Sequence, residues 1–128
     1  MRYLGIDYGA KKIGIAISDE EGTMAFPKGV FSNDKNFLET IKKICQEENI
    51  GTIVLGQSFN SSGNHNKIME EITPFKKIIE SDIKLPVHFQ REDFTTMEAR
   101  RYNDKHSADA SAAAIILQRY LEKLTTRN

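Results

Sequence analysis

The sequence predicts an α/β fold in which helices pack on the faces of a mixed five-stranded sheet. Three strand-like segments come first and are joined by short connections, which is typical of an antiparallel meander. Two further apolar segments then alternate with helical patterns, and such crossover units bring their strands in parallel with right-handed connections. The predicted order of elements is therefore β-β-β-α-β-α-β-α-α.

The meander is predicted over residues 3–8, 12–18 and 23–31. Asp19-Glu20-Glu21-Gly22 supplies the turn between the second and third strands. Pro27 lies inside the third segment and cannot donate a ladder hydrogen bond, so it favours an edge position.

A helix follows and should fade near Asn49. Ser32-Asn33-Asp34 offers capping chemistry at its start. Its apolar residues recur with helical spacing: Phe37, Leu38, Ile41, Ile44 and Cys45. Cys45 is the sole cysteine, which excludes an intrachain disulfide and a cysteine zinc cluster, and its position indicates a small core residue rather than a nucleophile.

The next strand is predicted at 52–56, a short continuous apolar run of the kind that is covered on both faces. A polar loop over 57–66 leads to a helix whose apolar residues are Ile68, Met69, Ile72, Phe75, Ile78 and Ile79. Pro74 should kink or interrupt this helix, because proline removes a hydrogen bond and clashes with the preceding turn.

The last strand is predicted at 86–89. Thr95 or Thr96 can cap a short helix that ends near Tyr102. The final helix, over 108–124, buries an apolar stripe: Ala112, Ala113, Ile116, Leu117, Tyr120 and Leu121.

Composition narrows the class of protein. The 128 residues fit one domain spanning 1–128, and 39% hydrophobic with 28% charged residues is a globular balance. Eighteen acidic and eighteen basic side chains cancel, which removes an overall electrostatic attraction to nucleic acid but leaves room for a local basic patch. No apolar run has membrane-spanning length and no signal-peptide pattern opens the chain, so we expect a cytoplasmic protein without membrane contact.

Asp7 is the most informative residue, because it stands where an apolar strand should finish undisturbed. Leu4 and Ile6 predict burial, while Gly5 and Gly9 allow another group to approach the backbone. A buried carboxylate is costly unless it is paired or bound to a cation. Asp7 therefore needs partners elsewhere in the chain.

Two acidic residues can provide such a site with Asp7. Glu92 follows the last predicted strand, and Asp109 begins the final helix, where the helix dipole favours a negative charge. Each alone more often has a structural role, but three carboxylates on converging elements suit Mg²⁺ or Mn²⁺. No histidine or cysteine cluster competes as a metal site, since His65, His88 and His106 are far apart in sequence.

The same residues carry a resemblance to the YqgF/RuvX family, which has a ribonuclease H-like fold. The similar blocks span the chain in order: Leu4-Gly5-Ile6-Asp7-Tyr8-Gly9, Ile13-Gly14-Ile15-Ala16-Ile17-Ser18-Asp19, Ile53-Val54-Leu55-Gly56, Glu92 ahead of Thr95-Thr96, and Asp109 with Ala112-Ala113. Members are described as Holliday junction resolvases and as nucleases that mature the precursor of 16S ribosomal RNA. The resemblance implies that Asp7, Glu92 and Asp109 form a catalytic, metal-binding trio.

Candidate substrate contacts follow from the resemblance and from residue chemistry. Lys11 or Lys12 falls where the family usually has a basic residue, which can contact a phosphate. The loop of small polar residues after the fourth strand, including Ser58 and Asn60, offers side chains and backbone amides that can contact phosphates. Loops of this composition are more often ordinary surface loops. The chain also departs from the family's usual Asp-Glu-Arg, because Arg91 and Asp93 flank Glu92 with their charges exchanged.

The leading hypothesis is a divalent-metal-dependent endonuclease that acts on structured RNA, as in 5′-end processing of pre-16S rRNA in ribosome biogenesis, or on branched DNA. A binding module of the same fold, holding nucleic acid or a ribosome-assembly partner without cutting it, is the alternative that the exchanged charges motivate. A phosphotransferase ranks last, because its nucleotide would lie between two such domains. The chain is expected to be a monomer or a weak homodimer, and a symmetric four-way junction would call for the dimer.

Overall fold

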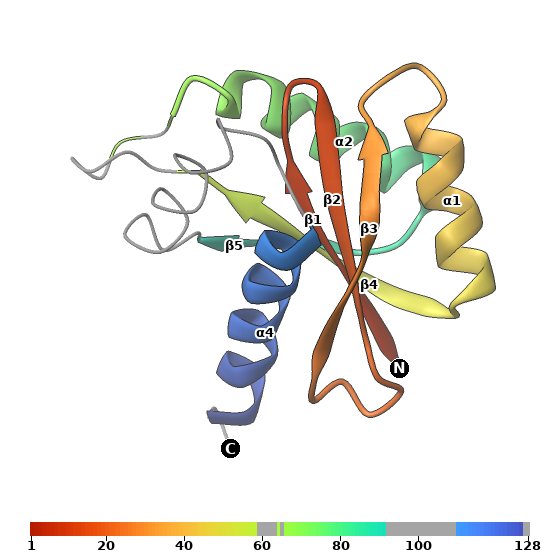
Figure 1. Cartoon of the computed structure of the whole chain (residues 1–128), viewed down its shortest axis with the longest axis vertical. Coiled ribbons are helices and arrows are strands. Elements are labelled where there is room, and N and C mark those ends of the chain that lie inside the picture. Colours follow the sequence, from red (N-terminus) through yellow and green to blue (C-terminus); the bar gives the residue numbers. More distant parts are fainter. Residues whose placement is uncertain (59–63, 65, 92–109, 127–128) are drawn as a thin grey trace.

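The computed structural model describes residues 1–58, 64, 66–91 and 110–126, which form a single sheet with helices on both faces (Figure 1). The described elements, in chain order, are β1 (Arg2–Tyr8), β2 (Lys12–Ser18), β3 (Ala25–Ser32), α1 (Phe37–Glu47), β4 (Ile50–Gln57), α2 (Met69–Ile83), β5 (Val87–Arg91) and α4 (Ala110–Thr126). The predicted short helix near 95–102 lies outside the described residues.

The sheet has the strand order β3-β2-β1-β4-β5, so β1 lies at its centre. The pairs β1–β2 and β2–β3 are antiparallel, whereas β1–β4 and β4–β5 are parallel. This confirms the predicted sheet of an antiparallel meander followed by two parallel strands. β3 lies at an edge, as Pro27 predicts.

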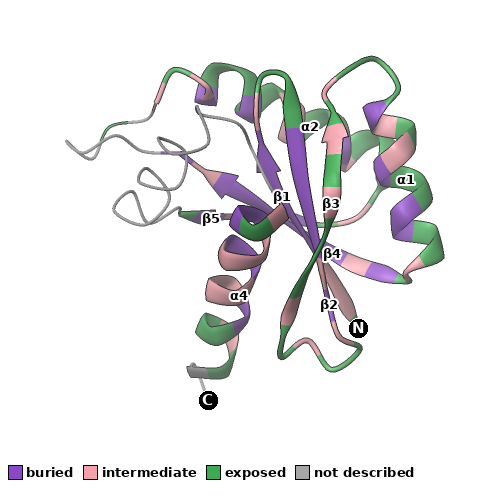
Figure 2. Ribbon diagram, viewed as in Figure 1, coloured by how far each residue is buried: buried purple, intermediate pink, exposed green. Residues whose placement is uncertain are grey.

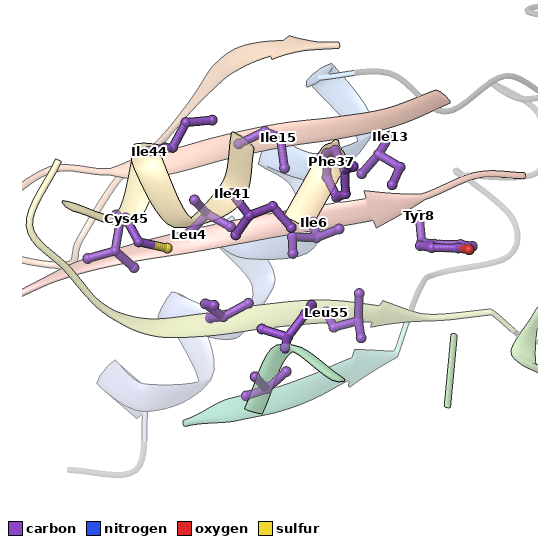
Figure 3. Packing of buried hydrophobic residues seen from close by; sticks show 14 of the residues in the cluster. Leu4, Ile6, Tyr8, Ile13, Ile15, Phe37, Ile41, Ile44, Cys45 and Leu55 are labelled. Atoms are coloured by element: carbon purple, nitrogen blue, oxygen red, sulfur yellow. The ribbon is translucent and has the colours of Figure 1, made fainter. Parts of the chain in front are cut away.

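One face of the sheet packs against α1 and α2. The strands β1, β2 and β4 are mostly buried (Figure 2). Strand alternation sends Leu4, Ile6 and Tyr8 of β1 to this face, where they join the apolar stripes of α1 and α2 in one core. Figure 3 shows these residues beside those of α1. The stripe of α1 consists of Phe37, Ile41, Ile44 and Cys45, and all four are buried. This face therefore holds the larger part of the core.

The opposite face packs against α4 alone among the described helices. Its core consists of small and branched side chains: Ala16, Val54, Ala112, Ala113, Ile116, Leu117 and Leu121. Gly5 is the point of closest approach, because a Cβ atom there would lie 2.8 Å from Leu117 Cβ and 3.0 Å from the Ala113 carbonyl oxygen. The absent side chain lets the helix lie directly on β1.

The helix α4 runs in the direction opposite to β1. Gly5 lies beneath Ala113 and Leu117, and the Tyr3 ring lies 6.1 Å from that of Tyr120, nearer the carboxyl end of the helix. Two strand residues rise about 6.6 Å, which corresponds to about four helical residues. The first turn of α4 therefore approaches the level of Asp7.

The predicted interruption of the second helix at Pro74 is wrong, because α2 continues from Met69 to Ile83 with Pro74 inside it. Pro74 lies in the second turn and on the exposed side, where the unpaired carbonyl of the preceding turn can be hydrated. Burial of Met69, Ile72 and Ile79 against the sheet outweighs the lost hydrogen bond.

No helix in the described ranges has both the length and the apolar character that crossing a membrane would require.

Cys45 is predicted to be chemically inert in the folded protein. It is buried in the α1 face of the core (Figure 3), and this burial raises the pKa of its thiol to about 11. Because the thiolate is the nucleophile, Cys45 should not react with a disulfide reagent at pH 8 until the protein unfolds. Titration of the thiol with and without denaturant measures this, and rapid labelling of the native protein would contradict it.

Candidate functional site

Asp7 lies near the carboxyl end of the central strand and is completely buried, with 0% of its surface exposed. Alternation along β1 puts it on the α4 face, two residues beyond Gly5. The strands β1, β4 and β5 are parallel, and functional groups of open α/β sheets gather at the carboxyl ends of such strands. The N-terminal turn of α4 approaches this end, and its dipole favours a negative charge.

Glycines flank Asp7 in both neighbouring strands. Gly14 of β2 is its registered partner, and the β1–β4 register, continued by one residue from Ile6 and Leu55, sets Gly56 of β4 on the other side. Neither neighbour has a side chain to cover the carboxylate laterally. Whatever covers the buried Asp7 carboxylate on the α4 face therefore comes from elsewhere than these two neighbours.

Lys12 lies on the same face as Asp7, because it is two residues from Gly14 along β2. Its side chain is exposed. Lys11 is also exposed and belongs to the turn between β1 and β2. The structure therefore brings Lys12 to the side of the sheet that carries Asp7, at the same end.

Asn33 fixes the turn that carries these lysines. Its side-chain amide donates to the carbonyl oxygens of Gly9 and Ala10 at 2.8 and 3.3 Å, and its backbone N–H donates to the Lys11 carbonyl at 2.8 Å. The residues next to Asn33 in the sequence predict only a helix-capping role for it. Its contacts with the turn connect residues distant in sequence, which local patterns do not reveal.

Tyr8 anchors the end of β1 from the opposite face. Its hydroxyl donates to Glu71 Oε1 of α2 at 3.3 Å, and its ring packs on Phe75 with centroids 4.8 Å apart. Burial raises the pKa of the Tyr8 hydroxyl; Asn33 opposes this effect, whereas the Glu71 carboxylate adds to it. The residue that follows Asp7 is thus fixed by packing and by polar contacts.

Ser58 follows β4 at the same end of the sheet, but its hydroxyl is already used. The side chain is buried and its Oγ accepts a hydrogen bond from Asn66 Nδ2 at 2.7 Å, while its carbonyl oxygen accepts one from the Asn66 N–H at 3.0 Å. These contacts tie the chain after the loop back to the end of β4. Contact between Ser58 and a substrate stays a prediction.

Gln90 of β5 is a polar side chain that the sequence analysis did not single out. It is the registered partner of Gly56, so Gly14, Asp7, Gly56 and Gln90 form one row across four strands, called here the Asp7 row. Gln90 is only 8% exposed, and its buried Oε1 has no hydrogen-bond partner in the structure as described. In the sequence, the alternation along this strand predicts that the Gln90 side chain faces the interior, but it predicts nothing more about its role.

The other predicted site residues lie outside the described residues: Asn60, Glu92 and Asp109. Among the residues that the structure describes, no three histidine, cysteine, aspartate or glutamate side chains gather into a possible metal site. The structure thus brings together Asp7 and Lys12 with the end of β4, and the convergence of the three acids stays a prediction.

The donor chemistry at Asp7 fits a hard divalent cation. The Asp7 row combines a buried carboxylate, a buried amide oxygen and two glycines that leave space, and oxygen ligands are those that Mg²⁺ and Mn²⁺ prefer. The residues present are therefore compatible with the metal that the sequence predicts.

A central strand bearing a carboxylate, with an antiparallel meander on one side and two parallel strands on the other, defines a protein of the ribonuclease H-like class. The family model described as "RuvX: Holliday junction resolvase" matches residues 1–123. The chain belongs to this family.

Curated relatives extend over nearly the whole chain. A protein of Dictyoglomus turgidum is 36% identical over 136 residues, covering 98% of this chain and 96% of the relative. One of Lactobacillus acidophilus is 33% identical and covers 95% of this chain and 96% of its own length. Both bear the name "Putative pre-16S rRNA nuclease".

Solved structures agree on the fold. RuvC of Thermus thermophilus, determined in complex with a Holliday junction substrate, has a TM-score of 0.61 at 12% identity, with coverage of 98% of this chain and 96% of RuvC. The fowlpox virus Holliday junction resolvase has a TM-score of 0.55 at 15% identity, covering 96% of this chain and 99% of the resolvase. At these identities the likeness shows a shared fold alone.

Proposed function

We propose that the protein is a divalent-metal-dependent endonuclease that hydrolyses phosphodiester bonds in structured RNA, with the 5′ end of pre-16S rRNA as the leading substrate and branched DNA as the other. The observation that carries the proposal is the fully buried Asp7 between two glycine neighbours at the carboxyl end of the central strand. The names of the curated relatives support the RNA substrate.

Asp7, Glu92 and Asp109 are the residues proposed to hold Mg²⁺ or Mn²⁺. In the chain, Glu92 directly follows Arg91 at the end of β5, and Asp109 directly precedes Ala110 at the start of α4. When bound, such a metal activates water and stabilises the leaving oxygen of a phosphodiester. The parallel strands β1 and β5 end at the same edge of the sheet, which the first turn of α4 approaches, and this supports the assignment.

The chain's own groups have separate tasks in this scheme. Asp7 orients the site from a rigid strand, since Tyr8 is fixed by Glu71 and Phe75 on the opposite face. The glycine neighbours admit a phosphate close to the backbone. Lys12 supplies a positive charge to the phosphate on the exposed side, and Asn33 holds the turn before it. Such positioning of substrate by a rigid scaffold supplies much of the rate enhancement in hydrolysis.

Replacement of Lys12 by alanine should weaken substrate binding with little loss of stability. Lys12 is exposed, so the change removes a phosphate contact and lowers the slope of log K against log salt by about 1. Binding of pre-16S rRNA fragments at several salt concentrations measures both effects. Lys43→Ala is the matched control, because Lys43 is also exposed but belongs to α1 on the opposite face. Equal salt slopes for the two variants would rule out this role.

The proposed activity is tested by a cleavage assay that offers a pre-16S rRNA fragment and a four-way DNA junction side by side, with and without Mg²⁺. Metal-dependent cleavage of the RNA is the expected result, and cleavage that persists in excess chelator would contradict the mechanism. Preference for the junction would shift the substrate to DNA and would call for a homodimer, since a symmetric junction needs two related active sites.

A binding module that holds nucleic acid without cutting it is the second candidate. The observation that favours it is the Arg91-Glu92-Asp93 sequence, in which the charges around the glutamate are exchanged relative to the family's usual order. Nucleic-acid binding without cleavage, together with no Mn²⁺ binding, would establish this alternative.

A further inference from the structure

We infer that Gln90 is an additional metal-binding residue of the proposed nuclease site, supplying a neutral amide oxygen opposite Asp7. This inference rests on the proposed function, because it concerns the same divalent cation. It goes beyond the acidic trio by assigning a ligand on β5 that is not a carboxylate.

Gln90 lies in the Asp7 row, on the same face of the sheet as Asp7. Gly56 separates the two residues, so Asp7 and Gln90 are two strand spacings apart, about 10 Å between Cα atoms. Both belong to the α4 face. Two side chains that extend toward each other, together with a cation that binds each oxygen at about 2.1 Å, can span this separation.

Gly56 lies between Asp7 and Gln90 in this row and has no side chain. Any larger residue at this position would put a side chain on the α4 face directly between Asp7 and Gln90. Glycine is disfavoured inside strands and commonly marks the close approach of a ligand. The gap in the row therefore lies where a cation shared by the two oxygens would be bound.

The Gln90 amide has one end hydrogen-bonded and the other end without a partner among the described residues. Its Nε2 donates to the Arg91 carbonyl oxygen at 3.2 Å, which orients the amide and leaves Oε1 as the group still to be satisfied. That oxygen is buried, and the described structure provides no donor for it. A buried acceptor without a hydrogen-bond partner costs about 1–3 kcal/mol of stability. Such an acceptor is therefore expected where a bound ligand supplies the missing partner.

A neutral ligand has a specific consequence for a phosphodiesterase. An amide oxygen adds to the coordination of the cation without adding negative charge, so it does not repel the incoming phosphate as a fourth carboxylate would. The site can thus hold its metal while remaining attractive to an anionic substrate.

The test measures Mn²⁺ affinity by electron paramagnetic resonance, independently of cleavage. Gln90→Met keeps the length and volume of the side chain but removes the oxygen, and should raise the Mn²⁺ Kd by about 10-fold or more. Gln90→Glu restores an oxygen with a charge and should bind Mn²⁺ at least as tightly as the wild type.

Gln118→Met is the matched control. Gln118 lies on α4, and both ends of its amide are occupied, since Oε1 accepts from the Ala25 N–H at 2.9 Å and Nε2 donates to the Thr23 carbonyl at 3.1 Å. This variant should lose stability and keep its Mn²⁺ affinity. Gln90→Met should show the reverse, with metal-free stability unchanged or higher because a buried unsatisfied acceptor is removed.

The outcomes separate the inference from the proposed function. Wild-type protein that binds Mn²⁺ with the same Kd as Gln90→Met would overturn the role of Gln90 and leave the metal-dependent nuclease intact, with water as the partner of Oε1. Wild-type protein that binds no Mn²⁺ would overturn both. Weaker binding by Gln90→Met, with recovery in Gln90→Glu, supports the inference.

Discussion

Asp7→Asn is expected to lower the rate of Mg²⁺-dependent cleavage by on the order of 10³-fold, the upper end of the loss that follows removal of one electrostatic stabiliser. Asparagine has nearly the same shape as aspartate, but it lacks the negative charge that a hard cation requires. Single-turnover cleavage of a pre-16S rRNA fragment measures the loss.

Folding should survive this change. A neutral amide of nearly the same shape costs less to bury than a carboxylate, so metal-free Asp7→Asn should still fold and unfold in one cooperative transition. The matched control is Asp82→Asn, at an exposed position of α2 on the opposite face of the sheet, which should leave cleavage unchanged. Undiminished cleavage by Asp7→Asn would refute the assignment of the site.

Gly5→Ala is expected to destabilise the protein by about 1–3 kcal/mol, the cost of inserting a methyl group into a packed core. The new Cβ would lie 2.8 Å from Leu117 Cβ and 3.0 Å from the Ala113 carbonyl oxygen, and the latter is a backbone atom that cannot rotate away. Relief requires α4 to lift from β1. Denaturant unfolding should therefore show a lower midpoint, and the displaced helix should also reduce cleavage.

Gly29→Ala is the matched control for Gly5→Ala. A Cβ atom at Gly29 on the edge strand β3 would lie 3.5 Å from the ring of Phe31, which is ordinary van der Waals contact. Its free energy of unfolding should change little or rise slightly, because alanine restricts the unfolded chain more than glycine does. Equal destabilisation by both substitutions would show that loss of glycine as such, rather than the packing of α4, causes the effect.

The sheet could be predicted from the sequence because its signals are local. Short turns identify the antiparallel meander, the run 52–56 lies within β4, and Pro27 marks the edge strand. Pro74 misled the prediction, since its exposed position lets α2 continue. A rule for isolated helices cannot include the burial of one helical face against a sheet that forms elsewhere in the chain.

The candidate site was only partly predictable. Asp7 could be singled out, because a carboxylate in an apolar strand is anomalous wherever the strand lies. Gln90 could not, because its meaning depends on the registers of β1, β4 and β5, which no short segment contains. Asn33 was assigned to a helix cap from its neighbours in sequence, whereas its side chain binds the turn after β1.

The packing of α4 on β1 also determines when the fold can be completed while the chain is being synthesised. Gly5 belongs to β1 and Leu117 to α4, so this packing joins two segments that are far apart in the sequence and leave the ribosome at different times. Domains fold as units once their chain is available, and non-local contacts form late. A ribosome-bound chain without α4 should therefore display β1 without its covering helix, and nuclease activity should appear only after the helix has emerged.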